Sequence, residues 1–233
     1  MKKLIRILIV NNNLSTLAKK IKKRLIFMGI LSFFGLGSKS LTPKETELVN
    51  KLDFNVELMK ELKNEVKSEL IQLPSIDEET ADIVDKLYNG ICTSISEDRI
   101  NFIVKKFKKV FRAKGYLIFA FTGENDIKSI GVIKGTNDLE ILRYRKTNGI
   151  NHDYKNEDII AKISEWNEKY GLIIIGCGQD WVELEFKKLP SDLSSFSEEV
   201  YEFCPDSVDQ GVGEVENLKE LIKEMNGIWL WWD

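Results

Sequence analysis

The sequence predicts an α+β protein with a mainly antiparallel sheet and helices packed on one face of that sheet. Residues 172–175 (LIII) form a continuous apolar run typical of a buried strand, residues 181–186 (WVELEF) alternate in strand fashion, and the segments between such runs repeat apolar residues at helical spacing. With 43% hydrophobic and 30% charged residues, the composition is that of an ordinary globular protein. From residue 129 onward the expected succession is β-α-α-β-β-α-α-β, an elaborated ferredoxin-like β-α-β-β-α-β order.

The N-terminal elements are expected to be helices. Residues 42–45 (TPKE) supply an N-cap threonine, a proline at the first helical position and a glutamate that closes a capping box. The apolar spacing after them is interrupted, which favours two short helices over one. Ser75 and Glu78 repeat the capping signal. From Asp98 a longer amphipathic helix is predicted by an apolar stripe of Ile100, Ile103, Phe107, Val110 and Phe111.

The second half is expected to begin with a hairpin. Residues 116–121 (YLIFAF) and 129–134 (SIGVIK) are rich in strand-forming residues, and a Gly-Glu-Asn-Asp segment separates them. The later elements are a helix capped by Thr136 or Asn137, a helix from about Glu157 to the C-cap Gly171, strands at 172–175 and 181–186, helices opened by Pro190 and near Val215, and a last strand at 228–232.

We expect three regions along the chain: a basic and apolar N-terminal extension at 1–40, a mainly helical region at 41–112, and an α+β domain at 113–233. The extension holds nine Lys or Arg and no acid, so residues 41–233 hold 25 basic and 37 acidic side chains and carry a charge of −12. Because an acidic body repels phosphate backbones, no nucleic-acid partner is expected.

Cysteine and histidine are scarce in this sequence. The chain has an odd number of cysteines, Cys92, Cys177 and Cys204, and their spacing is not that of a zinc site or a redox pair. This favours a reducing compartment. The single histidine, His152, excludes a site built from several histidines. The sequence contains no nucleotide-binding loop, dinucleotide fingerprint or nucleophile elbow. We therefore assign no cofactor and no metal, and we expect a cytoplasmic protein.

The N-terminal extension allows three interpretations. One is a secretory signal with a basic start and the short apolar run at 25–37, in which case the protein is exported. A second is attachment to a membrane surface through residues 19–37, whose lysine cluster would meet anionic lipid while the phenylalanines enter the interface. The third, which we favour, takes Met28 as the true start and residues 1–27 as upstream sequence.

Three unusual sequence words follow one another in the second half: TNG at 147–149, VYEFCPDSVDQG at 200–211 and LWWD at 230–233. In this order, and over about residues 115–233, the chain resembles the bacterial domain-of-unknown-function 4253 family. The resemblance implies no activity, substrate or catalytic residue. The chain departs from the family pattern in its residues 1–27 and in Cys177, where many relatives have a small residue.

Loop carboxylates form the first candidate site. Asp206 and Asp209 lie with Gln210 in the loop 204–211, and such a group is suited to binding a cation or polarising a water. A metal-assisted hydrolase would use Asp206, Asp209 and Glu183. The alternative, which we favour, is a loop whose aspartates cap backbone amides.

Tryptophans form the second candidate site, comprising Trp181, Trp229, Trp231 and Trp232. Alternation along the last strand sends Trp232 to one face of the sheet and Trp229 and Trp231 to the other. If that second face is open, its aromatic rings would anchor a ligand or a protein partner; if helices cover both faces, the rings belong to the core.

Arg143 and Asn148 are candidates for holding an anion, because they lie at and just after the end of a helix with a basic last turn. Basic residues are also what a helix C-terminus prefers, and we favour that explanation. Together these observations favour a non-catalytic cytoplasmic protein-binding or accessory module, with an immunity-type protein included. The alternatives are the metal-assisted hydrolase and a peripheral membrane protein anchored by its N-terminal segment.

Overall fold

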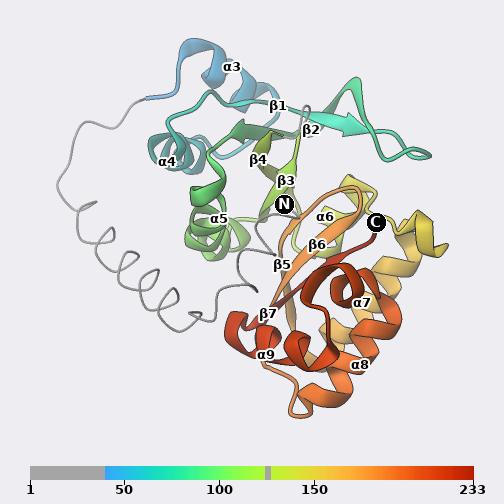
Figure 1. Ribbon diagram of the computed structural model, residues 1–233. Helices are drawn as coiled ribbons and strands as arrows, with labels where there is room; N and C mark the ends of the chain where they lie inside the picture. Colours follow the sequence, from blue (N-terminus) through green and yellow to red (C-terminus); the bar gives the residue numbers. More distant parts are fainter. Residues whose placement is uncertain (1–39, 124–126) are drawn as a thin grey trace.

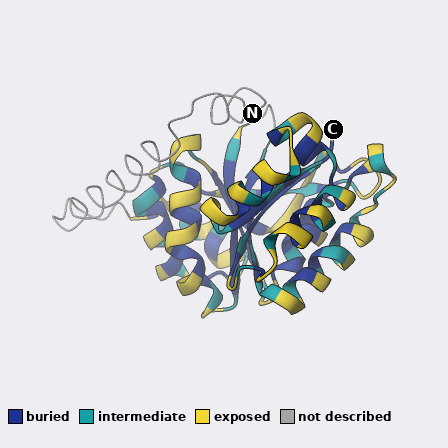
Figure 2. Ribbon diagram, turned by 60° about the horizontal axis from the view of Figure 1, so that its bottom comes forward, coloured by how far each residue is buried: buried dark blue, intermediate teal, exposed yellow. Residues whose placement is uncertain are grey.

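The computed structural model describes residues 40–123 and 127–233, and in this part of the chain one seven-stranded sheet lies between two layers of helices (Figures 1 and 2). The predictions made for residues 1–39 lie outside the described residues. The strands are β1 (Ile71–Ile76), β2 (Ile83–Ser94), β3 (Tyr116–Thr122), β4 (Lys128–Lys134), β5 (Leu172–Cys177), β6 (Trp181–Phe186) and β7 (Gly227–Trp231). The helices are α3 (Pro43–Lys51), α4 (Val56–Val66), α5 (Glu97–Arg112), α6 (Leu139–Arg145), α7 (Asn156–Tyr170), α8 (Leu193–Phe203) and α9 (Val215–Met225), with a 3-10 turn η2 (Ile150–His152) and a π-helical turn η3 (Ser207–Val212).

The strand order is β1-β2-β4-β3-β5-β6-β7, and the sheet is mostly antiparallel. Its exception is the parallel pair of β3 and β5, in which Ala120 faces Gly176 and Phe121 faces Cys177. From β4 to β7 the elements follow one another along the chain as predicted. The ferredoxin-like order is not confirmed, because β3, which precedes that segment, lies between β4 and β5.

Helices cover both faces of the sheet, so the expectation of helices on one face is wrong. Helices α3, α4 and α5 pack on one face, and α6 to α9 pack on the other (Figure 1). Strand β3 explains this arrangement, because its apolar side chains alternate between two cores. Leu117, Phe119 and Phe121 belong to the core under α6 to α9, whereas Tyr116, Ile118 and Ala120 belong to the core under α3 to α5.

The N-terminal part of the structure combines expected helices with two unexpected strands. The capping box is confirmed, since Thr42 Oγ1 accepts from the Glu45 amide at 3.2 Å and the Glu45 carboxylate accepts from the Thr42 amide at 2.8 Å. Two short helices, α3 and α4, follow as predicted. The helix signal at Ser75 and Glu78 is wrong, because Ser75 lies in β1. Strands β1 and β2 join the same sheet as the C-terminal strands.

The C-terminal elements form as predicted, with differences at the starts of α6 and α8. The N-cap of α6 is Asp138 and not Thr136 or Asn137, because the helix begins only at Leu139. Asp192 caps α8 by accepting a hydrogen bond from the Ser195 amide at 3.0 Å, so Pro190 precedes the helix instead of opening it. The closing segment is strand β7, which pairs antiparallel with β6. Across residues 40–123 and 127–233, no helix combines the length and the apolar character needed to cross a bilayer.

Candidate functional site

The three unusual sequence words meet at the edge of the sheet formed by β7. Gly149 packs against the indole of Trp232, so closely that a Cβ atom at this position would lie 2.8 Å from Trp232 Cγ. His152 Nε2 lies 2.7 Å from Asp206 Oδ2. The backbone amide of Asp233 donates to the same Asp206 oxygen at 2.8 Å. The loop after α6, the turn after α8 and the end of the chain therefore form one cluster.

Asp206 is the acceptor at the centre of this cluster. Its second oxygen, Oδ1, accepts a hydrogen bond from Gln210 Nε2 at 2.9 Å. Burial alone would raise the pKa of Asp206, but the hydrogen bonds from the Asp233 amide, Gln210 and His152 outweigh it and lower the pKa below its usual value. Asp206 therefore stays ionised at neutral pH, and its role is to hold the end of the chain.

Cys204 and Ser207 occupy the outer edge of β7. The thiol of Cys204 donates to Trp231 O at 3.1 Å and accepts from Trp231 N at 3.2 Å, and Ser207 Oγ donates to Trp229 O at 3.2 Å. Burial raises the pKa of Cys204 to about 11, so the thiol stays protonated and is a poor nucleophile at neutral pH. Because edge strands expose unpaired backbone groups, these two side chains close an edge that would otherwise be open to another strand.

The carboxylates proposed for a hydrolase do not converge. Asp209 accepts a hydrogen bond from the Tyr201 hydroxyl at 3.1 Å. Glu183 faces α5 on the opposite side of the sheet from α8, where Asn101 Nδ2 lies 2.9 and 3.1 Å from its two oxygens. Among the described residues, no three His, Cys, Asp or Glu side chains are grouped in a way that could hold a metal ion. The geometry therefore gives the metal-assisted hydrolase no support.

The tryptophans divide between the two faces as alternation predicts. Trp232 is 2% exposed and lies in the core under α6 to α9, where its Nε1 donates to Phe203 O at 3.3 Å. On the other face, Trp181 and Trp229 stack with ring centroids 4.6 Å apart and planes 8° from parallel. The core under α3 to α5 includes no residue of β6 or β7, so the helices leave this end of the face partly open. Trp181 is 6% exposed, whereas Trp229 and Trp231 are half-buried, and Trp231 donates a side-chain hydrogen bond to Asp180. We call Trp181, Trp229 and Trp231 the tryptophan surface.

Lysine and carboxylate side chains frame the tryptophan surface. Lys128 Nζ lies 5.6 Å from the ring centroid of Trp181, which is a cation–π contact. Lys105 of α5 pairs with Glu185 of β6. Burial raises the pKa of Glu183, and the hydrogen bond from Asn101 opposes that shift. The surface is therefore an aromatic patch with polar groups of both charges around it.

Of the two residues proposed for an anion site, Asn148 is engaged in contacts within the chain. Arg143 is exposed on α6. The Asn148 side chain donates to Lys146 O at 3.2 Å, and its backbone amide donates to Gln179 O at 2.8 Å. Thr147 Oγ1 donates to Gly178 O at 2.7 Å. The TNG segment thus holds the turn between β5 and β6, and no anion site results from these contacts.

His152 is the cluster residue that the sequence does not identify as part of a site, because it is the single histidine of the chain and no sequence motif includes it. Its partner, Asp206, is separated from it by 54 positions, and no local pattern connects the two. The available signal is indirect: TNG at 147–149 lies shortly before His152, and Asp206 lies within the second unusual word at 200–211. Only the fold brings them together.

Fold and site define a mixed α/β protein whose C-terminal strand is held in place by polar side chains of its own chain, with an aromatic surface on the neighbouring face. Residues 129–233 match the family model described as Domain of unknown function (DUF4253), which confirms the resemblance over this C-terminal part of the chain. No curated protein and no solved structure matches the chain.

Proposed function

We propose that the protein is a non-catalytic binding module that takes a protein partner on the tryptophan surface. The observation that carries this proposal is the stack of Trp181 and Trp229 beside half-buried Trp231 at the edge of the sheet. Tryptophan is enriched at the energetic centres of protein interfaces, because a large rigid ring contributes contact area at a small entropic cost. A polar rim around an apolar centre is also typical of such interfaces.

The partner docks through side chains and not by adding a strand. Strand addition needs free backbone groups on an edge strand, and Cys204 and Ser207 occupy those of Trp229 and Trp231. The indole rings of Trp229 and Trp231, in contrast, are partly exposed on the face of the sheet, with the buried ring of Trp181 stacked on Trp229. The surface therefore favours a folded partner over an extended peptide.

Charge favours a partner with a basic surface. Residues 41–233 carry 25 basic and 37 acidic side chains, and a negative body accelerates the approach of positive proteins. An accessory or immunity-type role in the cytoplasm fits such a partner. The three cysteines, each buried as a free thiol, are compatible with a reducing compartment.

Crosslinking from the tryptophan surface tests the proposal. A photoreactive amino acid replaces Trp229 in one version of the chain and the exposed Leu87 of β2 in another, and crosslinked proteins from native cells are identified by mass spectrometry. We expect a partner that crosslinks at position 229 and not at position 87. That protein is then purified, and its affinity is measured by isothermal titration calorimetry.

The variant Trp229→Ala/Trp231→Ala should bind the purified partner at least about 30-fold more weakly, which corresponds to a loss of about 2 kcal/mol. Leu87→Ala should bind as the parent chain does. The unfolding midpoint of each variant is measured in parallel, so that a folding defect is separated from lost contacts. Equal affinity of the folded double variant, or crosslinks that do not depend on position, would rule the proposal out.

A further inference from the structure

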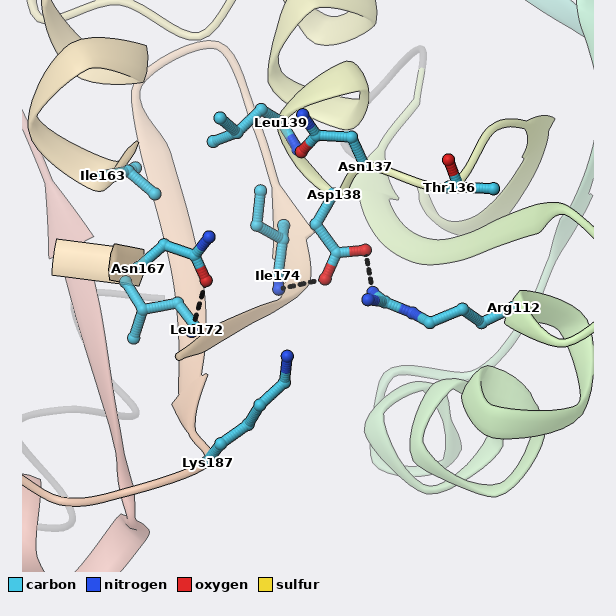
Figure 3. Close-up of a pocket in the computed structure, with 10 residues that line it drawn as sticks. All are labelled: Arg112, Thr136, Asn137, Asp138, Leu139, Ile163, Asn167, Leu172, Ile174 and Lys187. Carbon is cyan, nitrogen blue, oxygen red and sulfur yellow. Dashed lines mark hydrogen bonds and ion pairs between the residues drawn. The ribbon is translucent and has the colours of Figure 1, made fainter. Parts of the chain in front are cut away.

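A pocket of about 270 Å³ lies beside the start of β5, between the loop that precedes α6 and the end of α7 (Figure 3). The parallel pairing of β3 and β5 is limited to Ala120 with Gly176 and Phe121 with Cys177, toward the carboxyl ends of the two strands. Nearer the start of β5, two side chains form hydrogen bonds with the backbone of Ile174. Asp138 accepts from its amide at 3.2 Å, and Lys108 Nζ donates to its carbonyl. Side chains therefore take the place of a β3 partner at Ile174, and both Ile174 and Asp138 line the pocket.

The pocket has an apolar wall and a polar side. Its apolar wall consists of Leu139, Ile163, Leu172 and Ile174. The polar side consists of Arg112, Thr136, Asn137, Asp138, Asn167 and Lys187. In Figure 3, Arg112 and Asp138 face each other on one side, and Asn167 lies across the pocket from them.

The acceptor groups of the pocket are already occupied. Asp138 pairs with Arg112 through Oδ1, while Oδ2 accepts from Ile174 N and lies 3.8 Å from Lys108 Nζ. Asn167 Oδ1 accepts from Leu172 N at 2.7 Å, and Asn137 Oδ1 accepts from Leu139 N at 3.1 Å. Because each amide oxygen is engaged, each Nδ2 group is left as a donor.

Lys187 adds a positive charge to these donors. Its amine points toward the space between Asn167 and Asp138 (Figure 3), and within residues 40–123 and 127–233 it has no hydrogen-bond or ion-pair partner. The stem of Lys187 packs on Gly171, where an added Cβ would lie 3.0 Å from Lys187 Cδ. This packing directs the amine toward the pocket.

We propose that this pocket binds a small carboxylate with an aliphatic body. The carboxylate would accept hydrogen bonds from Lys187 and from the two asparagine amides, and the aliphatic body would lie against Ile163, Leu172 and Ile174. The volume is slightly below the roughly 300–1,000 Å³ of pockets for drug-sized ligands, so the ligand is metabolite-sized. This site lies apart from the tryptophan surface and does not depend on the protein-binding proposal.

Binding of hexanoate to the full chain tests the proposal, with 1-hexanol as its neutral analogue and inorganic phosphate as an anion without an apolar body. Affinities are measured by isothermal titration calorimetry and by amide chemical shifts. We expect hexanoate to bind at least about 10-fold more tightly than either comparison compound, because only hexanoate uses both the donors and the apolar wall. Equal binding of hexanol or of phosphate would overturn the proposal, as would no binding of hexanoate.

Two variants locate the binding site. Lys187→Met keeps the aliphatic stem and should weaken hexanoate binding at least about 10-fold, whereas Lys188→Met, at the exposed neighbouring lysine, should bind as the parent chain does. Thr136→Trp, at an exposed position of the pocket rim, should block hexanoate without changing any charge. Unfolding midpoints confirm that each variant is folded, and unchanged affinity in folded Lys187→Met or Thr136→Trp overturns the assignment.

Discussion

Glu45 shows how one buried side chain holds several segments together. Its carboxylate is fully buried, accepts from Lys63 Nζ at 2.5 Å and from the Leu70 amide at 2.8 Å, and also closes the capping box with Thr42. It thereby joins α3, α4 and the residue before β1. The sequence predicted the capping role, but it could not predict the burial, because Lys63 lies 18 residues away and comes close only when the two helices pack.

Glu45→Gln should lower the free energy of unfolding at pH 7 by about 3–5 kcal/mol, because the charge of Lys63 is then left buried without its counterion. The measurement is urea unfolding followed by circular dichroism. Glu69→Gln is the control, because its ion pair with Lys44 is solvent-exposed, and it should change stability by less than about 1 kcal/mol. Similar losses in both variants would contradict this role of Glu45.

The contribution of Glu45 should also depend on pH. Burial alone would raise the pKa of Glu45, but the hydrogen bonds from Lys63, Leu70 and Thr42 outweigh it and lower the pKa from 4.5 to about 2. Since the folded state has the lower pKa, the stabilisation is present above pH 4.5 and is lost as the pH falls toward 2. The stability difference between the parent chain and Glu45→Gln should shrink across this interval, and a constant difference would argue against the linkage.

The outer edge of strand β7 is closed by side chains from the segment that precedes α9. Alternation predicted the strand and the faces of its tryptophans correctly. It could not predict that Cys204 and Ser207 would bond to the backbone of Trp229 and Trp231, because these contacts require the turn at η3 to fold back on the sheet. Loop sequences carry no periodicity from which such a contact could be inferred.

Cys204→Val/Ser207→Ala should expose the edge of β7. We expect the free energy of unfolding to fall by about 1–3 kcal/mol, since buried backbone groups lose their partners. We also expect concentration-dependent self-association, because an open edge pairs with other strands. Light scattering coupled to size-exclusion chromatography measures the association. Cys92→Val, at a buried cysteine away from this edge, should remain unassociated.

The sequence does not predict strands β1 and β2, because their formation also depends on contacts that are distant in the chain. Ser75 and Glu78 have the spacing of a helix N-terminus, and Pro74 interrupts the strand pattern of β1. Strand β2 is exposed over much of its length, so it lacks the apolar pattern of a buried strand. What makes this segment a hairpin is its pairing with itself and with β4, which is separated from it in the chain by α5 and β3. Non-local pairing of this kind overrides local propensity.

At the scale of the whole molecule, the sheet extends beyond the segment that matches the family model. Residues 129–233 include β5 and all of β4 except Lys128, but β3, which lies between these strands in the sheet, precedes that segment. Helices α3 to α5, which cover one face, precede it as well. Local patterns predicted the succession of C-terminal elements, whereas the two-sided sheet follows from how segments distant in sequence come together.

A fragment of residues 129–233 should therefore not fold cooperatively, because β4 loses both neighbouring strands and one face of the sheet loses its helices. Near-ultraviolet circular dichroism of the tryptophans, followed through a urea titration, measures this. A fragment of residues 40–233 serves as the control and should show a sigmoidal transition. Cooperative unfolding of the shorter fragment would show that β3 and the N-terminal helices are dispensable.

The short parallel contact between β3 and β5 also has a consequence for partial unfolding. Long antiparallel ladders hold the strands on either side of it, whereas the contact itself joins only two residues of each strand. Separation along this line breaks fewer backbone hydrogen bonds than separation between any other pair of neighbouring strands. Lys108 and Asp138, which bind the backbone of Ile174 there, thus set how readily the two halves of the sheet move apart as cooperative units.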